Sequence, residues 1–364
     1  MHKPDYVFIG LIGVIVVFGL VMLSSASSAV AYEKFGDSYW YLKHQIIFGL
    51  LPGLAVFFIM ARTDYRKWKK YALPFLAVSV VLLFLVFIPG LGAGYGRAKS
   101  WINIFGVSLQ PSEIVKLTFL IYLAAWLSGR REHDIKDTYS SFVPFVSILG
   151  IISFLMAVQP DIGTLSIIAL ISLVVYFAAG APILHLGWIS GAGALLFFIL
   201  IKIAPYRAAR FMTFLHPELD PQGIGYHINQ ALLAIGSGGF FGLGLGLSRQ
   251  KFQYLPEVAG DSIFAVIAEE LGFLFAVGLI IFFIFLALRG FKIAKSVPDG
   301  FGRLLAIGIT SWFVFQAFIN IGAMLSLLPI TGIPLPFISY GGTALTVGLA
   351  AAGIMANISK NCRE

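Results

Sequence analysis

Ten long runs of apolar residues alternate with shorter polar segments along the chain. The runs cover roughly residues 6–24, 45–61, 71–88, 113–129, 142–158, 163–180, 183–203, 263–288, 303–326 and 342–358. Each is near the length of about 20 residues with which a helix crosses the hydrocarbon core of a bilayer. The runs are continuous, whereas barrel strands would be short and alternating. The pattern predicts an all-α membrane protein, with a single domain over residues 1–364 built as a polytopic bundle of ten transmembrane helices.

One polar segment is much longer than the others and runs from about 203 to 262, between the seventh and eighth spans. Long loops in compact domains usually serve a function. Within it, residues 228–235 are expected to form an amphipathic helix on the membrane interface. The glycine-rich stretch 236–246 would let backbone approach a ligand closely. A second unusual loop, 328–343, holds three prolines and cannot be regular helix, so we expect it to dip toward the same cavity.

Composition supports the membrane assignment and limits the possible partners. The chain of 364 residues is 59% hydrophobic and only 12% charged, against about 25% charged in soluble domains. Its net charge of +8 is typical of basic cytoplasmic loops, and no basic–aromatic module indicates nucleic acid. Cys362 is the only cysteine, which excludes an intramolecular disulfide.

The basic residues of the short segments predict the orientation of the bundle. Fifteen Lys and Arg residues lie at the two chain ends and in the loops on their side, against four in the short loops on the opposite side. The side with more Lys and Arg faces the cytoplasm. Both termini are therefore expected to be cytoplasmic, and the long 203–262 loop to be extracytoplasmic.

Four carboxylates stand out near the eighth span. Asp261 directly precedes the apolar run and is either the N-cap of that helix or a general base at the outer mouth of a membrane cavity. Glu257 is either a solvated side chain or a partner of Arg249 or Lys251. Glu269 and Glu270 lie inside the span, where carboxylates are costly and are functional candidates by default. Their alternative is a buried hydrogen bond or ion pair to another helix.

Several cations could form an anion site on the outer side. Lys116 lies about one turn inside the fourth span, three residues after Glu113, so it either pairs with Glu113 or offers a fixed charge for phosphate. The other candidates are Arg97, Lys99, Arg207 and Arg210, each otherwise a lipid-headgroup anchor. Too few ligands gather for a metal site to be predicted.

Six stretches carry a resemblance to a known family, and they occur in order along most of the chain. They are GRAKSWI (96–102), QPSEIVKL (110–117), QALLAIGSGG (230–239), SRQKFQYLPE (248–257), DSIFAVIAEELG (261–272) and PITGIPLPFISYGGT (329–343). The chain resembles the SEDS proteins (shape, elongation, division and sporulation), which include RodA and FtsW. The fourth stretch is closest to the FtsW and sporulation branch. The residues that flank Asp261 depart from the family's usual HisThrAspPhe pattern.

The resemblance implies an enzyme: a peptidoglycan glycosyltransferase that polymerises lipid II, a disaccharide-pentapeptide on undecaprenyl pyrophosphate, at the outer face of the plasma membrane. Asp261 matches the family's essential aspartate and Lys116 its fourth-helix lysine. We expect Asp261 to act as general base and the cations to bind pyrophosphate or sugar, with inversion at the anomeric carbon. Glu113, Glu257, Glu269, Glu270, Ser339 and Gly341 are expected to support the site. A divalent cation (Mg²⁺ or Mn²⁺) could share the leaving-group charge.

Two other functions stay open at this point. A lipid II flippase would be a transporter, and a non-enzymatic scaffold would only hold a penicillin-binding protein. Transporters show internal repeats and discontinuous helices around a midplane site, and no repeat is evident here. The resemblance also implies a class B penicillin-binding protein, a transpeptidase, as partner, besides membrane lipid.

Overall fold

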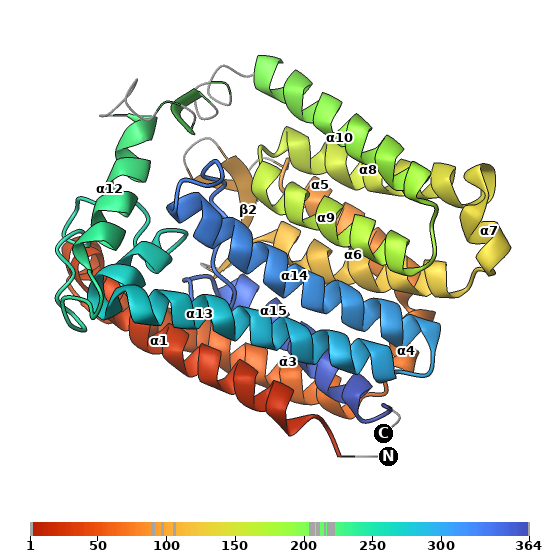
Figure 1. Cartoon of the computed structure of the whole chain (residues 1–364), viewed down its shortest axis with the longest axis horizontal. Coiled ribbons are helices and arrows are strands. Elements are labelled where there is room, and N and C mark those ends of the chain that lie inside the picture. Colours follow the sequence, from red (N-terminus) through yellow and green to blue (C-terminus); the bar gives the residue numbers. More distant parts are fainter. Residues whose placement is uncertain are drawn as a thin grey trace.

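The protein is a bundle of helices with one small sheet (Figure 1). The computed structural model describes residues 3–88, 92–95, 98–104, 107–203, 208, 212–214, 216 and 223–362. Its long helices are α1 (Tyr6–Phe35), α3 (Leu51–Arg62), α5 (Ala72–Leu85), α6 (Pro111–Ser128), α8 (Val143–Val158), α9 (Ile162–Ala178), α10 (Ile183–Ile203), α12 (Ile224–Ser237), α13 (Ile263–Ser296), α14 (Gly300–Met324) and α15 (Gly342–Ser359). The short ones are α2 (Trp40–Gln45), α4 (Arg66–Lys70) and α7 (Glu132–Lys136), with π-helical turns η1 (Ile46–Leu50) and η2 (Thr138–Phe142).

The predicted membrane-helical fold is confirmed. Six of the described helical segments are long and apolar enough to cross a membrane: Tyr6–Phe35, Trp40–Arg62, Thr138–Val158, Ile263–Ser296, Gly300–Met324 and Gly342–Ser359. Three shorter apolar helices cover Ala72–Leu85, Ile162–Ala178 and Ile183–Leu196. Every predicted run coincides with a helix, but the count of ten membrane crossings stays a prediction.

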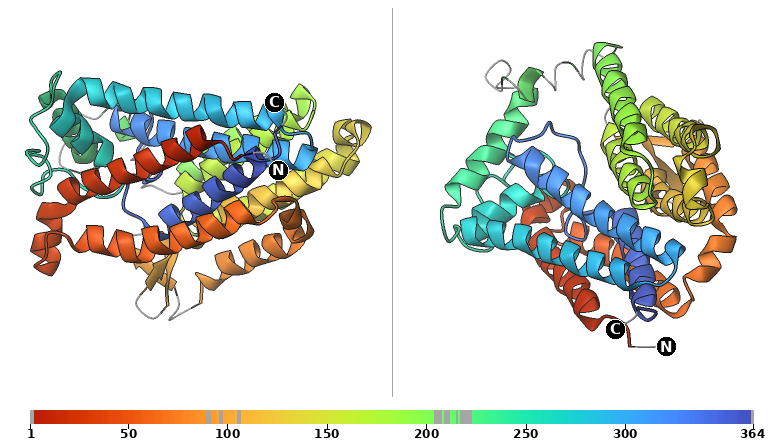
Figure 2. Two further views of the ribbon diagram at one scale, coloured as in Figure 1. Left: turned by 90° about the horizontal axis from the view of Figure 1, so that it is seen from below. Right: turned by 45° about the vertical axis from the view of Figure 1, so that its right-hand side comes forward.

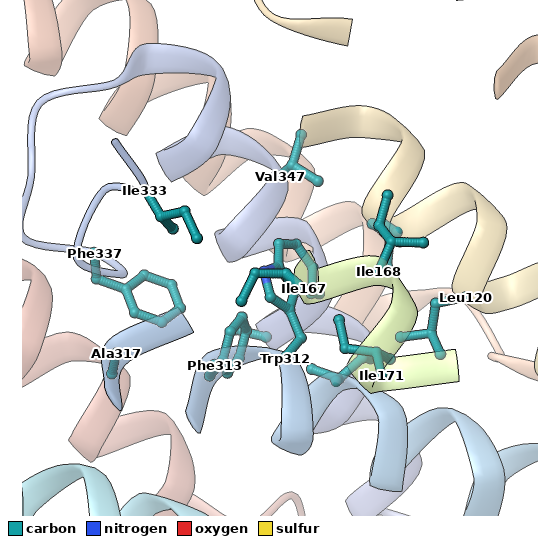
Figure 3. Close-up of a cluster of buried hydrophobic side chains, with 14 of the residues drawn as sticks. Leu120, Ile167, Ile168, Ile171, Trp312, Phe313, Ala317, Ile333, Phe337 and Val347 are labelled. Atoms are coloured by element: carbon teal, nitrogen blue, oxygen red, sulfur yellow. The ribbon is translucent and has the colours of Figure 1, made fainter. Parts of the chain in front are cut away.

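Most residues of α6, α14 and α15 are buried, so these helices form much of the interior of the bundle. Figure 3 shows the apolar cluster where α6, α9, α14 and α15 meet the 333–337 loop, with Leu120, Ile167, Trp312 and Phe337 among its members. In lipid, helices associate mainly by close packing of small residues. Gly53 on α3 shows this, because a Cβ there would lie 2.6 Å from the side chain of Leu349 on α15.

A three-stranded antiparallel sheet lies where the sequence analysis expected only loop. β1 (Gly92–Tyr95) pairs with β2 (Ala98–Ile104), and β2 pairs with β3 (Val107–Leu109). The strands are three to seven residues long, too short for a periodic pattern to identify. The sheet leads directly into α6 and so fixes where that helix begins.

Helix α13 is broken at Gly272, and the glycine-rich segment fills the break. Gly272 has φ 81° and ψ −179°. The backbone N–H groups of Leu243 and Gly244 donate to the carbonyls of Glu269 and Glu270 at 3.0 and 2.9 Å, and Phe273 N–H donates to the carbonyl of Gly239 at 2.9 Å. The glycines of 236–246 therefore allow backbone to approach α13, which corrects the expectation that they serve a ligand.

The two ends of the bundle differ in structure. We call the end that holds residues 107–112, 159–161, 251–262 and 333–341 the loop end. Both described chain ends lie together at the opposite, terminal end (Figure 2), where the Asp5 backbone N–H donates to Ser359 Oγ at 2.9 Å. At that end Tyr65 is hydrogen-bonded to Asp299, and burial together with this bond raises the pKa of the Tyr65 phenol.

The break in α13 predicts that alanine costs different amounts of stability at two glycines that both have positive φ. Gly242 has φ 80° and a Cβ there would lie 2.2 Å from the carbonyl oxygen of Glu270, whereas Gly246 has φ 85° and nothing within 4 Å. Gly246→Ala should cost about 1–2 kcal/mol from backbone conformation alone. Gly242→Ala should cost a further ~1–3 kcal/mol from overpacking.

Thermal unfolding of both variants in detergent measures this difference. Equal losses of stability would contradict the close approach of the glycine-rich segment to α13.

Candidate active site

Asp261 lies at the loop end, one position before the cap of α13. Its side chain is largely buried, with the residue 8% exposed. The helix begins at Ile263, and Ser262 takes the N-cap position without a side-chain hydrogen bond to the helix. Asp261 is thus part of the preceding turn, so the interpretation of it as a helix cap is wrong.

The turn that carries Asp261 is fixed by α14 and by the 333–340 loop. Asn320 Nδ2 donates to the backbone carbonyl of Asp261 at 2.8 Å and to that of Ile333 at 2.8 Å. Ser339 Oγ donates to the carbonyl of Gly260 at 2.7 Å. Tyr340 N–H donates to the carbonyl of Ala259 at 2.8 Å. Three consecutive carbonyls, 259–261, are therefore bonded to one partner surface.

The 328–343 loop is irregular, as predicted, and its 333–339 part is buried except for the half-buried Pro334. Ser339 Oγ also accepts from the N–H of Leu335 at 2.8 Å, which closes the loop on itself. Gly341 precedes α15, and its N–H donates to Gln45 Oε1 at 2.9 Å. Both residues thus hold backbone in place, and the supporting role expected of them stays a prediction.

Three polar residues of this region were not singled out from the sequence: Asn320 and His227, which bond residues 261–262, and Gln316, which bonds the carbonyl of Pro334. Asn320 and Gln316 lie in an apolar span, where a polar side chain is itself a signal. His227 looked isolated in the sequence, but its Nε2 lies 2.6 Å from Ser262 Oγ. No sequence pattern could join His227 to residue 262, because α12 reaches α13 only through tertiary packing.

Lys116 forms a buried ion pair, as one of its two sequence interpretations predicts. Its Nζ lies 2.7 Å from Glu113 Oε1, and the two side chains are 1% and 2% exposed. It also donates to Gln316 Oε1 at 2.8 Å and lies 4.9 Å from the Trp312 ring centroid. The adjoining cavity, lined in part by Glu113, Gln316 and Ser339, has about 20 Å³. Ligand pockets are about 300–1,000 Å³, so this cavity is too small for a sugar or a pyrophosphate.

The ion pair and the Asp261 turn belong to one hydrogen-bond network. Gln316 and Asn320 are four residues apart, which places them on one face of α14. Gln316 Nε2 donates to the carbonyl of Pro334 at 2.8 Å, while Asn320 bonds the neighbouring carbonyl of Ile333. Residues 333–334 therefore connect Lys116 on one side with Asp261 on the other.

Glu269 and Glu270 are fully buried and bind the segment that precedes Asp261. Glu269 accepts from Ser248 Oγ at 2.5 Å and from the N–H of Arg249 at 2.9 Å. Glu270 lies 2.8 Å from Lys251 Nζ, with side chains 0% and 2% exposed, and accepts from Ser25 Oγ of α1 at 2.6 Å. This geometry matches the buried-pair interpretation. Glu257 is exposed, and Lys251, one of its two predicted partners, pairs with Glu270 instead.

The remaining predicted cations lie outside the described part of the structure. This holds for Arg97, Arg207 and Arg210, and for the side chain of Lys99, so their role as an anion site stays a prediction. Among the described residues, no three His, Cys, Asp or Glu side chains gather as a metal site would require.

Replacing one partner of the buried Lys251–Glu270 pair should strongly reduce the stability of the protein. Lys251→Met leaves a buried carboxylate without its partner, which typically costs about 3–5 kcal/mol. The double variant Lys251→Met/Glu270→Leu removes both charges and should regain much of that loss. Lys43→Met is the matched control, because its pair with Asp37 is solvent-exposed and should change the unfolding temperature little.

Thermal unfolding of the purified variants measures all three. A single variant as stable as the wild type would contradict the buried pair.

Known proteins resemble this chain over nearly its whole length. A family model described as cell cycle protein, FTSW_RODA_SPOVE, matches residues 5–364. The chain is 40% identical to stage V sporulation protein E of Bacillus subtilis over 361 residues, 99% of this chain and 98% of that one. It is also 40% identical to the probable peptidoglycan glycosyltransferase FtsW of Trichlorobacter lovleyi, covering 99% and 94%.

Solved structures agree with the sequence comparison. One solved structure concerns the structural coordination of polymerization and crosslinking by a peptidoglycan synthase complex. Its matching chain has a TM-score of 0.79 and 27% identity, and the match covers 99% of this chain and 98% of that one. The crystal structure of the rod shape determining protein RodA of Thermus thermophilus matches with TM-score 0.73 and 27% identity, covering 99% and 98%. The resemblance found in the sequence is thereby confirmed, and the chain belongs to the FtsW, RodA and SpoVE family of cell cycle proteins.

Proposed function

We propose that the protein is a peptidoglycan glycosyltransferase that polymerises lipid II, with Asp261 as the general base. The observation that carries the assignment is the position of Asp261: a carboxylate in a turn whose three carbonyls are bonded to α14 and the 333–340 loop. A general base needs to be held within reach of the proton that it removes. The names of the relatives support the same reaction.

The proposed reaction joins two lipid-linked sugars. Asp261 takes the proton from the 4-hydroxyl of the acceptor sugar while that oxygen attacks the anomeric carbon of the donor. The new C–O bond forms as the bond from that carbon to undecaprenyl pyrophosphate breaks on the opposite face, so the configuration inverts. The leaving pyrophosphate carries away the bonding electrons, and positive charge near it would lower the barrier.

We assign the leaving-group charge to Arg97, Lys99, Arg207 and Arg210 rather than to Lys116. Glu113 already neutralises Lys116 at 2.7 Å, and the pair is buried. Lys116 therefore serves the site by holding Gln316, and through it the carbonyl of Pro334. No step of the proposed reaction runs through a metal, and an assay with and without a chelator tests the role of Mg²⁺ or Mn²⁺.

The proposal places the loop end outside the plasma membrane and both termini in the cytoplasm. The distribution of Lys and Arg in the short loops supports this orientation. A class B penicillin-binding protein as partner is supported by the similar chain from a peptidoglycan synthase complex. The sequence branch closest to this chain, FtsW and sporulation, agrees with its similarity to stage V sporulation protein E.

One observation favours a second candidate function, a lipid II flippase. Transporters often have discontinuous helices, and α13 is broken at Gly272. The broken backbone is bonded to residues 239–244, however, and the carboxylates beside it are paired with Lys251 and Ser248. The break is thus filled by protein, which favours catalysis.

Replacement of Asp261 tests the proposal. Asp261→Asn keeps the size of the side chain and removes its basicity, so the rate of lipid II polymerisation should fall about 10²–10⁴-fold. Asp64→Asn, the same change at the terminal end, is the control and should leave the rate unaltered. The assay follows glycan formation by purified protein in detergent.

Each alternative gives a different result in the same assay. Unchanged polymerisation by Asp261→Asn would remove that residue as the base. A wild-type protein that moves lipid II into protein-free liposomes without forming polymer would be a flippase, and one that does neither would be a scaffold.

A further inference from the structure

An open cleft of about 400 Å³ lies at the loop end, and the proposed reaction does not use it. One wall is the last part of α1, with Ser28, Tyr32 and Glu33, and Ser38 follows in the next turn. The other wall is the turn after Lys251, with Phe252 and Gln253. The volume lies within the range of about 300–1,000 Å³ that is usual for ligand sites.

The length of α1 places this cleft outside the hydrocarbon core. Its 30 residues extend about 45 Å at 1.5 Å per residue, while the core is only about 30 Å thick. The apolar run ends near residue 24, where a serine-rich stretch begins. We therefore expect residues 28–33 to extend beyond the hydrocarbon core at the loop end, where a sugar can bind.

Ser28 Oγ in the cleft wall donates to the carbonyl of Ser25 at 2.9 Å, but four other polar side chains of the cleft have no such partner among the described residues. The side chains of Tyr32, Glu33, Ser38 and Gln253 take part in no hydrogen bond or ion pair with the described residues. Nearby Asp37 differs, because Lys43 Nζ donates to it at 2.7 Å, and this bond lowers the pKa of the Asp37 carboxyl. The cleft thus offers a phenol, a hydroxyl, an amide and a carboxylate, together with the ring of Phe252.

The backbone at Gln253 indicates that this wall is held in a specific shape. Gln253 has φ 67°, a left-handed conformation that is uncommon for a residue other than glycine. Such strain persists where the surroundings fix it, often at ligand sites. The surroundings here are the buried Lys251–Glu270 pair two residues earlier and the buried Leu255 two residues later.

We propose that this cleft binds the growing glycan strand on its way from Asp261. Sugar hydroxyl and acetamido groups both donate and accept hydrogen bonds, as do the phenol, hydroxyl and amide of the cleft. The apolar face of a sugar ring packs on aromatic rings such as Tyr32 and Phe252, which are 66% and 56% exposed. The turn 252–261 runs from the cleft directly to Asp261. This inference rests on the proposed function.

Binding of an uncharged oligosaccharide tests the cleft without the reaction. The probe is chitotetraose, four β-1,4-linked N-acetylglucosamine units, which has neither pyrophosphate nor peptide. We expect it to bind the full-length protein in detergent, measured by isothermal titration calorimetry. Tyr32→Ala and Gln253→Ala should each weaken binding about tenfold, the equivalent of about 1.4 kcal/mol. Tyr139→Ala, a change at an 85% exposed tyrosine of η2, should not.

The length of the polymer gives a second measurement. Tyr32→Ala and Gln253→Ala should form shorter glycan strands than the wild type, because a strand that is no longer held dissociates earlier. Failure of wild-type protein to bind chitotetraose, or equal binding and equal strand lengths in the variants, would overturn the inference.

The experiments distinguish failure of the glycan-binding cleft from failure of the glycosyltransferase assignment. The Asp261→Asn variant should bind chitotetraose with the same affinity as the wild type, because this binding depends on the cleft alone. Absence of any polymer from wild-type protein would instead count against the glycosyltransferase assignment.

Discussion

Two adjacent carboxylates inside a membrane helix must be paired, and the loop end of this protein is arranged around that requirement. Glu269 and Glu270 lie one turn before the break in α13 and are fully buried. An isolated carboxylate in a low-dielectric interior costs several kcal/mol. The cost is offset here by the side chains of Lys251 and Ser248 and by three backbone N–H groups, all from one segment of the long loop. Ser25 of α1 adds a further hydrogen bond to Glu270.

That pairing has a structural consequence for the site. Once residues 248–251 are bonded to α13, the turn 252–261 has to return over a short distance to the start of the same helix. Asn320, Ser339 and Tyr340 then fix its last three residues from the other side. Asp261 is thus held between two anchors, one on α13 itself and one on α14 with the 333–340 loop. The carboxylate is thus positioned through its backbone.

Much of this arrangement could be predicted from the sequence, and the reasons are physical. Apolar runs located ten of the long helices because hydrocarbon permits few alternatives. The pairings of Lys116 with Glu113 and of Glu270 with a basic partner were among the stated alternatives, because buried charges require partners. Asp261 stood out as a carboxylate at the start of a span.

Other features depend on contacts that no local pattern records. Asn320 contacts residue 261 across 59 positions of chain, and His227 reaches Ser262 through the packing of α12 on α13. The sheet β1–β3 is too short to produce a recognisable period. The glycines of 236–246 were correctly interpreted as permitting close approach, but the partner is the backbone of α13, which only the fold reveals.

The most direct test of this account is the polymerisation rate of Asn320→Leu. The variant keeps the side-chain volume nearly constant and removes both hydrogen bonds, to the carbonyls of Asp261 and Ile333. If the network positions the base, lipid II polymerisation should fall by about 10²-fold, as expected for a reactive group displaced by about 1 Å, in protein that remains inserted and folded. A rate equal to that of the wild type would contradict the claim that this network positions Asp261.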